Sequence, residues 1–410
     1  MSTLVLYDDA RARTFEPFAL TRPLGEVRAG AELIRHRWEV ALGRPCSGHL
    51  CAAHLADYSE PRAPGALRAG TLAAGTIVAN SRFAPSLAPV SASADAWACD
   101  GEIVAVRLAT ERNSAEFAEG APALATFVAP GAVVHDLGGH WLSAVWDLVG
   151  QLAPMLTADI PLLAADLMVS RPPAHATVVG QHEVHVEGGA HVEPYVVLDA
   201  TAGPILLRKG ATVQSFTRLV GPAYVGEGST VVGDRIATVS IGEVCKVHGE
   251  VSHVIFTGHS NKGHDGFVGH SVLGRWVNLG AGTITSNLKN TYGTVALWTP
   301  EGLRDSGLQF LGTLFGDHVK TGIGIRLTTG CVLGAGANVF DAMPPKMVAP
   351  FAWGSGAPYA TYALDKFLDV AKRMMSRRHV ELSASARMQL TAAHARAAEP
   401  AVAQRWASKA

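Results

Sequence analysis

The chain has 410 residues and a formal net charge of −1, with 34 Lys and Arg against 35 Asp and Glu. This length allows two or three domains with a large core, and the balanced charge without a polybasic segment argues against nucleic acid or an anionic membrane as a partner. The five cysteines are scattered and form no Cys-x-x-Cys pair, so neither a structural zinc site nor a disulfide framework is indicated.

Residues 1–175 are predicted to form an α/β domain, because short apolar runs typical of buried strands alternate with amphipathic segments typical of helices. The predicted strands are residues 4–7, 77–79 and 103–106, and the predicted helices are residues 31–42 and 141–155. Such alternation favours a mostly parallel sheet with covered faces. The first residues lack a basic stretch and a long apolar segment, and no apolar run reaches the roughly 20 residues that span a bilayer. We therefore expect a cytoplasmic, soluble protein.

Residues 176–345 place an aliphatic residue at every sixth position over long stretches. The period is clearest from Leu207 to Val231 and returns in residues 267–279 and 315–339. Neither a helix nor a single strand repeats every six residues. A solenoid with triangular coils does, because each of its three short faces turns one aliphatic inward. The predicted fold of this half is therefore a left-handed parallel β-helix.

Two further segments frame the repeats. Residues 285–306 interrupt the period with a polar segment, residues 285–292, followed by Trp298-Thr299-Pro300. Insertions in solenoids become loops on one face that is often the working face. The Pro-rich stretch 343–346 ends the repeats. Residues 346–410 are predicted to form a C-terminal helical extension, because apolar residues recur at spacings of three and four from Leu364 to Met375 and would pack on the last coil.

Residues 258–290 concentrate polar side chains that a β-helix does not need for folding, including His264, Asn261, Lys262, Asn278 and Asn287. Transfer of an acetyl group from a thioester to an amine needs a base such as histidine. It also needs hydrogen-bond donors for the oxyanion and a cation for an anionic substrate. The segment supplies all three residue types.

Residues 205–340 resemble the acetyltransferase half of the bifunctional N-acetylglucosamine-1-phosphate uridylyltransferase / glucosamine-1-phosphate N-acetyltransferase family. The similarity is carried by Ser260-Asn-Lys-Gly-His264 and by Leu273-Gly-Arg-Trp-Val-Asn-Leu-Gly-Ala-Gly-Thr-Ile-Thr-Ser-Asn287. The resemblance implies that His264 is the general base, that the substrates are acetyl-CoA and an amino-sugar phosphate, most simply glucosamine 1-phosphate, and that a homotrimer forms active sites between adjacent solenoids.

The resemblance also implies which residues contact the ligands. Asn278 matches an Asn that contacts the amino sugar, and Asn287 matches one near the reacting group. Ala281 matches a small residue beside the acetyl-CoA arm, and Gly334 and Ala335 match a later stretch along the same cofactor. Asn261 and Lys262 belong to the matched segment and are expected to bind substrate.

Two positions depart from the family pattern. The family's Lys twelve residues before the base is Ser252 here, and Lys262 or Lys246 is expected to take over its contact with phosphate. The family's Asn-Tyr-Asp-Gly loop reads Asn-Leu-Lys-Asn at residues 287–290, which would alter the sugar site or the acyl site.

The N-terminal domain resembles an alternative branch of sugar nucleotidyltransferases that lacks the usual Gly-rich phosphate loop. The similarity lies in the shortened opening, residues 6–9, and in Leu20-Thr-Arg-Pro-Leu-Gly-Glu-Val-Arg-Ala-Gly30. It implies that Arg22 and Arg28 hold the phosphates of a nucleoside triphosphate. Asp8 and Asp9 would help bind Mg²⁺ or fix Arg22.

Asn80, followed by Ser81 and Arg82, is a further candidate contact with substrate, because it lies where a strand of an α/β sheet ends. The whole chain is thus predicted to be a two-domain enzyme of sugar-nucleotide synthesis.

Two other functions stay open. One is a metal-dependent β-helix lyase of the carbonic anhydrase type, since His259 and His264, like His248 and His253, lie five residues apart. The other is a scaffold without catalytic activity that binds nucleotide or sugar.

Overall fold

The computed structural model describes residues 3–91 and 93–407. Contacts divide the chain into two compact units, Met1–Val145 with Leu382–Arg396, and Trp146–Glu381 with Ala397–Ala410. This grouping places α2 (Asp147–Gly150) and α3 (Leu152–Ala165) with the repeats, whereas the predicted boundary near residue 175 assigned them to the α/β domain. It also divides the residues of the predicted C-terminal extension between the two units.

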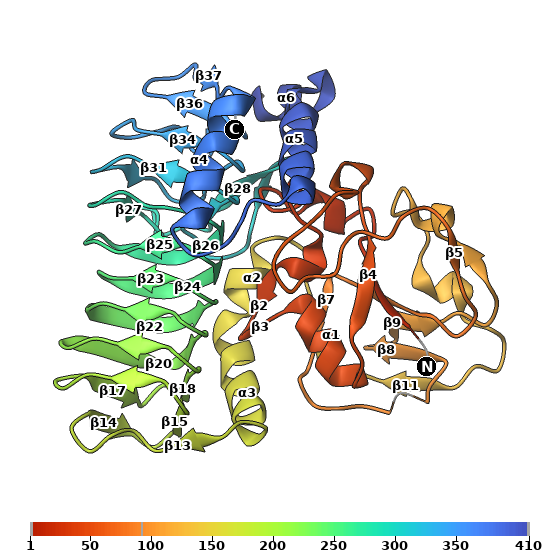
Figure 1. Ribbon diagram of the computed structural model, residues 1–410, viewed down its shortest axis with the longest axis horizontal. Coiled ribbons are helices and arrows are strands. Elements are labelled where there is room, and N and C mark those ends of the chain that lie inside the picture. The colour runs from red at the N-terminus through yellow and green to blue at the C-terminus, as the bar shows by residue number, and fades with distance from the viewer. Residues whose placement is uncertain (1–2, 92, 408–410) are drawn as a thin grey trace. The chain divides into compact units, whose positions relative to one another are not determined.

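The first unit is built on a six-stranded mixed sheet with the order β11-β8-β9-β6-β1-β4 (Figure 1). The strands are β1 Leu4–Tyr7, β2 Arg28–Ala29, β3 Glu32–Leu33, β4 Cys46–Leu50, β5 Thr71–Leu72, β6 Ile77–Asn80, β7 Phe83–Pro85, β8 Ala96–Cys99, β9 Glu102–Arg107, β10 Arg112–Asn113, β11 Val134–Asp136 and β12 Gly139–Trp141, and the helices are α1 Ile34–Leu42 and α5 Ala384–Ala398. β1 pairs in parallel with β4 and β6, while β9 runs antiparallel to β6 and β8. The predicted α/β class is confirmed.

Two predicted helices begin later than the apolar pattern suggested. α1 starts at Ile34 because the two preceding residues form β3, which pairs with β2. The segment predicted as a helix over 141–155 starts as a strand, since Trp141 in β12 pairs with Phe83 in β7 and the two rings pack edge to face at 5.5 Å. Tertiary pairing therefore overrides the local periodicity at both starts.

A buried ionic cluster ties the loop before α1 to the sheet. Glu26 is 2% exposed, and its Oε1 lies 2.6 Å from Arg35 Nε and 3.0 Å from His49 Nε2. Burial alone would raise the pKa of Glu26, but the hydrogen bonds and charges of His49 and Arg35 outweigh it and lower the pKa to about 2. Gly25 permits this close packing, because a Cβ there would lie 2.5 Å from Leu6 Cδ1 and 3.1 Å from His49 Cε1.

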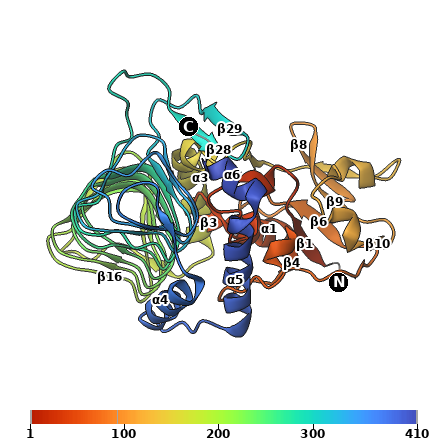
Figure 2. The ribbon, with the colours of Figure 1, turned by 90° about the horizontal axis from the view of Figure 1, so that it is seen from above.

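The second unit is a parallel β-helix flanked by helices, which confirms the predicted solenoid (Figure 1). Its elements are α2 Asp147–Gly150, α3 Leu152–Ala165, β13 Val169–Ser170, β14 Thr177–Gly180, β15 Val184–Glu187, β16 His191–Val192, β17 Val197–Ala200, β18 Ile205–Leu207, β19 Thr212–Val213, β20 Thr217–Val225, β21 Thr230–Val231, β22 Asp234–Ile241, β23 Lys246–Val247, β24 Val251–Gly258, β25 Asn261–Lys262, β26 Val268–Arg275, β27 Ile284–Thr285, β28 Ala296–Thr299, β29 Gly302–Asp305, β30 Thr313–Phe315, β31 Lys320–Thr321, β32 Arg326–Leu327, β33 Cys331–Leu333, β34 Asn338–Val339, β35 Met347–Val348, β36 Ala352–Gly354, β37 Ala360–Thr361, α4 Leu364–Ser376 and α6 Pro400–Ala407. Seen from above, the coils superimpose along a common axis (Figure 2).

The six-residue period corresponds to side chains that point into the solenoid. Its aliphatic members are buried, with Phe267 as a partly buried exception. On one face the register stacks Val213 on Val231 on Val247, and the next coil places Lys262 in the same column. A lysine therefore occupies a position that the other coils of this sheet fill with valine.

The predicted loop over 285–306 contains a hairpin of its own. β28 pairs antiparallel with β29, and Leu297 and Trp298 in β28 are buried. Trp298 packs against Trp406 of α6 with ring centroids 3.8 Å apart, and its Nε1 donates to Arg405 O at 3.2 Å. The apolar residues of the hairpin, Trp298 above all, explain why this segment packs on the C-terminal helix α6.

α4 packs its apolar side on the solenoid, as predicted. Phe367, Leu368, Ala371 and Met375 are buried, and the Phe367 ring contacts those of Phe351 and His318. Among the helices of residues 3–91 and 93–407, none has both the length and the apolar character that crossing a bilayer requires.

Candidate functional site

A groove at one corner of the solenoid brings together two residues predicted to act in acetyl transfer. His264 and Ala281 line it, and its volume is about 830 Å³. The remaining lining residues come from neighbouring coils: Val232, His248, Gly263, Asp265, Gly282, Ile323 and Gly324. The groove therefore offers an exposed imidazole beside the backbone of the next coil.

The turn that carries His264 is held from inside the solenoid. Lys262 is 2% exposed, and its ammonium group donates a hydrogen bond to the backbone carbonyl of His264. Gly266 closes the turn with φ +121°, and a Cβ there would collide with the carbonyl oxygen of Thr283. The His264 ring is exposed and makes no hydrogen bond to any other residue in the described ranges, so a substrate can reach it.

Burial changes the protonation of Lys262. Removal of water lowers its pKa to about 8, and the charges of Asp265 and Asp234 oppose this shift only in part. These two carboxylates flank His248, with Asp265 Oδ1 at 3.2 Å and Asp234 Oδ2 at 3.5 Å from its ring nitrogens. The acidic residues at this corner thus partly offset the cost of keeping an ammonium group inside the solenoid.

The substitution Lys262→Met tests this arrangement through the pH dependence of stability. A lysine whose pKa falls from 10.5 to about 8 on folding binds fewer protons in the folded state between these values, so its contribution to stability rises with pH across that window. We expect the thermal midpoint of the wild type, relative to that of Lys262→Met, to rise as the pH increases from 8 to 10.5. Scanning calorimetry of both proteins measures it, and parallel curves would contradict a buried, charged Lys262.

The backbone at Ala281 has a free donor. The carbonyl of Ala281 accepts from Gly324 N at 2.8 Å, but within residues 3–91 and 93–407 its N–H donates no hydrogen bond. A backbone N–H at a groove can stabilise an oxyanion without having to reorganise. The groove is thus lined by the residue with this unused backbone N–H and by an exposed imidazole, that of His264.

The described residues contain one cluster whose side-chain ligand atoms lie close enough together to hold a metal ion. It consists of Asp234, His248 and Asp265, whose ligand atoms all lie within 4.8 Å of one another. The four histidines of the predicted lyase alternative lie in different surroundings. His253 stacks on His270 with centroids 4.4 Å apart, and the His259 ring lies tilted against that of Trp276 with centroids 4.3 Å apart. Within one chain, these histidines do not form a three-histidine site.

The three asparagines of the matched segment do not line the groove of His264. Asn261 Nδ2 donates to Asn278 Oδ1 at 2.9 Å, on the adjacent solenoid face. Asn287 Nδ2 donates to His270 Nδ1 at 2.8 Å. The burial of His270 and its neighbour His253 lower the pKa of His270 to about 4, so it is a neutral acceptor at pH 7.

The predicted cofactor contacts further along the solenoid differ from Ala281 in exposure. Gly334 is buried and Ala335 is 0% exposed, so Ala335 presents no side-chain surface in this chain. On the groove itself, Ile323 is 81% exposed beside Gly324. The sequence pattern did not single out Ile323, because an exposed Ile in a repeat is indistinguishable from an inward one until the register is known.

A second candidate site lies where β1 and β6 end, at the edge of the sheet in the first unit. Asp9 accepts hydrogen bonds from Arg82 at 2.7–2.9 Å and from Asn80 Nδ2 at 3.0 Å. Burial would raise the pKa of Asp9, but Arg82 and Asn80 outweigh it and hold that pKa below its usual range. Asp8 is buried, accepts from Ser81 Oγ and from Leu24 N, and has its pKa raised by burial.

This arrangement does not offer a ready Mg²⁺ site. Magnesium is usually held by carboxylate oxygens and keeps several waters, yet the oxygens of Asp8 and Asp9 already accept from protein donors. We therefore assign no catalytic step to a metal at these carboxylates. The sheet edge instead holds Asn80 and Arg82 in fixed positions, with the Arg82 guanidinium 5.0 Å from the Trp141 ring centroid.

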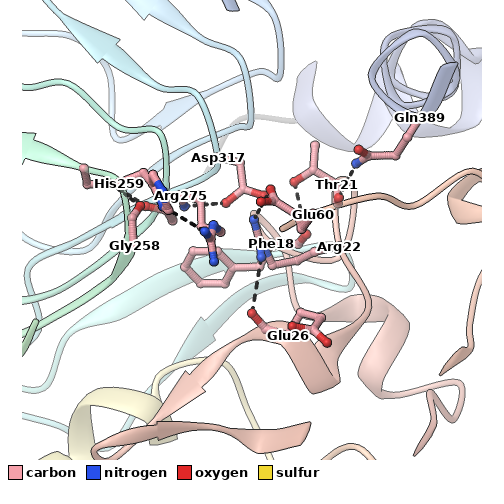
Figure 3. A network of polar contacts seen from close by, with 12 residues as sticks. Phe18, Thr21, Arg22, Glu26, Glu60, Gly258, His259, Arg275, Asp317 and Gln389 are labelled. Atoms are coloured by element: carbon pink, nitrogen blue, oxygen red, sulfur yellow. Dashed lines mark hydrogen bonds and ion pairs between the residues drawn. The ribbon is translucent and has the colours of Figure 1, made fainter. Parts of the chain in front are cut away.

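Arg22 and Arg28, the predicted phosphate ligands, are both buried. Arg22 donates to Glu26 O at 3.2 Å and lies 3.5 Å from Glu60 Oε1, as Figure 3 shows. Arg28 donates to the carbonyl of Ala31. In this structure both guanidinium groups hold the chain between residues 20 and 33.

Comparison with known proteins gives one family match, which covers the first unit up to Val145 and continues through α2 and α3 of the second. Residues 4–167 match the family described as sugar nucleotidyl transferase. A bifunctional sugar-1-phosphate nucleotidylyltransferase/acetyltransferase of Sulfurisphaera tokodaii is 34% identical over 91 residues, which are 22% of this chain and 23% of that protein. The bifunctional protein GlmU of Acaryochloris marina is 29% identical over 134 residues, 32% of this chain and 26% of its own.

GlmU of Desulfitobacterium hafniense is 27% identical over 201 residues, 42% of this chain and 41% of that protein. The chain thus matches less than half the length of each of these three relatives. Residues 4–167 match the sugar nucleotidyl transferase family, and the chain is similar to bifunctional nucleotidylyltransferase/acetyltransferases, as the sequence motifs predicted.

Proposed function

We propose that the chain acetylates an amino-sugar phosphate from acetyl-CoA in the groove of His264 and joins a sugar 1-phosphate to a nucleoside triphosphate in its first unit. One observation carries the first activity: an exposed imidazole and an unused backbone N–H, that of Ala281, line the same groove. The relatives named above support the pairing of the two activities.

The proposed acetyl transfer uses these two groups in sequence. The His264 ring removes a proton from the substrate amine, whose nitrogen attacks the thioester carbonyl. The N–H of Ala281 stabilises the resulting oxyanion. The C–S bond then breaks, the thiolate of CoA takes the proton from the imidazolium, and the products are an N-acetyl amide and CoA.

A neighbouring solenoid would complete this site. The groove lacks the predicted sugar contacts Asn278 and Asn287, which face other parts of the same chain. A trimer in which one solenoid brings its asparagines to the groove of the next would unite them, as the family resemblance implies. Gly334 and Ala335 stay predicted contacts for the cofactor arm, and a divalent cation such as Mg²⁺ would neutralise the triphosphate.

A coupled assay tests both activities. The full chain is incubated with acetyl-CoA, glucosamine 1-phosphate and either UTP or dTTP, and the release of CoA and of pyrophosphate is followed separately. We expect CoA release that needs the amino sugar and pyrophosphate release with at least one nucleotide. Absence of CoA release with every amino-sugar phosphate tried would reject the acetyl-transfer half.

The clustered Asp234, His248 and Asp265 favour a metal-dependent lyase as the second candidate. Three ligands of these types can hold a divalent ion and leave a position for water. Elemental analysis of protein purified without added metal distinguishes the two. We expect substoichiometric zinc, whereas one zinc per chain together with CO₂ hydration would favour the lyase.

A further inference from the structure

A second pocket lies between the solenoid and α4, apart from the groove of His264. Its volume is about 250 Å³, and it shares no lining residue with that groove. The lining residues are His259, Val277, Asn278, Lys320, Val370, Arg373, Met374, Arg377 and Arg378. Four of them are cations and none is a carboxylate.

The cations come from two elements that face each other. Arg373 lies on the side of α4 that also carries Val370 and Met374, and the C-cap residue Arg377 stands one turn further on. Arg378 follows the C-cap. Lys320 lies in β31, in the coil that pairs with Asn278. Basic residues at the end of α4 complement the helix dipole, but this does not explain a lysine on the opposite wall.

Among the residues that the structure describes, no ion pair neutralises these charges. In residues 3–91 and 93–407, none of the four forms an ion pair, and Lys320 Nζ donates only to the carbonyl of His318, at 3.1 Å. Glu243, a carboxylate that contacts the lining residue His259, is already engaged: its Oε1 lies 2.7 Å from Arg275 and 3.8 Å from His259 Nδ1. Figure 3 shows His259 beside Arg275.

Burial and neighbouring positive charges shift the pKa values of two of the four cations, Lys320 and Arg378. Burial, and then the charge of Arg378, lower the pKa of Lys320 to about 8. Burial also lowers the pKa of Arg378, with Arg377 acting in the same direction. Arg373 and Arg377 are exposed, whereas Lys320 and Arg378 are partly buried and have no ion-pair partner among the described residues. Keeping these two charges partly out of water costs free energy, and an anion that enters the pocket would recover part of it.

We propose that this pocket binds the phosphate group of a phosphoester or diphosphate. Guanidinium groups donate paired hydrogen bonds to phosphate oxygens, and Lys320 and Asn278 add donors from the opposite wall. The pocket is smaller than the roughly 300–1,000 Å³ that enclose whole drug-sized ligands. It therefore fits the charged group and leaves the rest of a larger ligand outside.

Calorimetric titration at constant ionic strength tests the proposal, with sodium pyrophosphate and glucosamine 1-phosphate as separate titrants. The variants are Arg373→Ala/Arg377→Ala and, as a control with one charge removed outside the pocket, Lys372→Ala. Alanine is the best helix former, so α4 is retained. We expect the double variant to lose a binding site, or to weaken it about 10- to 100-fold, for at least one titrant, and the control to bind like the wild type.

Pyrophosphate can also bind to the first unit, so amide hydrogen exchange is needed to locate the binding site. We expect the titrant that binds to slow amide exchange in residues 364–378 of the wild type and not in the double variant. Unchanged exchange there with both titrants, or equal weakening in Lys372→Ala, would overturn the proposal. Neither measurement depends on acetyl or nucleotidyl transfer, so this binding site can be confirmed even if the proposed activities are rejected.

Discussion

His264→Ala is expected to reduce acetyl transfer by roughly 10²–10⁴-fold, the usual contribution of a positioned general base. The ring is exposed on the groove and makes no hydrogen bond within the described ranges, so its removal leaves no buried group unsatisfied. The variant should therefore fold like the wild type. The rate of CoA release with glucosamine 1-phosphate measures the effect.

Nucleotidyl transfer in the same variant is the control. His264 lies in the second unit, whereas residues 4–167 carry the match to sugar nucleotidyl transferases. Pyrophosphate release should remain within about twofold of the wild type, as for independent sites. Equal loss of both activities would indicate misfolding, and full retention of CoA release would remove His264 from the reaction.

Glu26→Gln is expected to destabilise the first unit by about 3–5 kcal/mol, the cost of breaking a buried ion pair from one side. The substitution keeps the volume and leaves the Arg35 guanidinium and the His49 ring without their carboxylate. Chemical unfolding followed by tryptophan fluorescence measures the change. Glu116→Gln is the matched control, because its pair with Arg112 is exposed and should contribute less than about 1 kcal/mol.

The same variant predicts a pH dependence. The pKa of Glu26 falls from 4.5 to about 2 on folding, so the unfolded state binds more protons between these values. The stability that Glu26 provides is complete above pH 4.5 and is lost as the pH falls toward 2. The difference between wild type and Glu26→Gln should therefore shrink over that range, and a constant difference would contradict the charged, buried Glu26.

Periodicity predicted the β-helix because it reflects a repeated physical demand: one aliphatic side chain per face. The same rule could not predict Lys262, which interrupts a column of valines and holds the turn of His264 from inside. Because lysine is usually exposed, Lys262 was expected to bind an anionic group of the substrate from the surface. The inward register of one coil decides its place, and that register is visible only once the coils are stacked.

The stacking of the coils also decides which of the predicted site residues lie together. His264 and Ala281 share a groove because consecutive coils bring equivalent corners together. Asn278 and Asn287 are as close in sequence, yet they point from other faces of the solenoid. In the first unit, the motif around Arg22 indicated phosphate contacts, whereas tertiary packing buries its guanidinium against Glu60.

A comparison of two histidines tests most directly whether His264 is the general base. His270 lies beside Asn287, but its pKa of about 4 makes it a weak base at neutral pH, whereas the His264 ring is exposed in the groove beside Ala281. The measurement is the single-turnover rate of N-acetylglucosamine 1-phosphate formation in His264→Ala and His270→Ala. We expect the larger loss, at least about 10²-fold, in His264→Ala. A larger loss in His270→Ala, with His264→Ala close to the wild type, would contradict it.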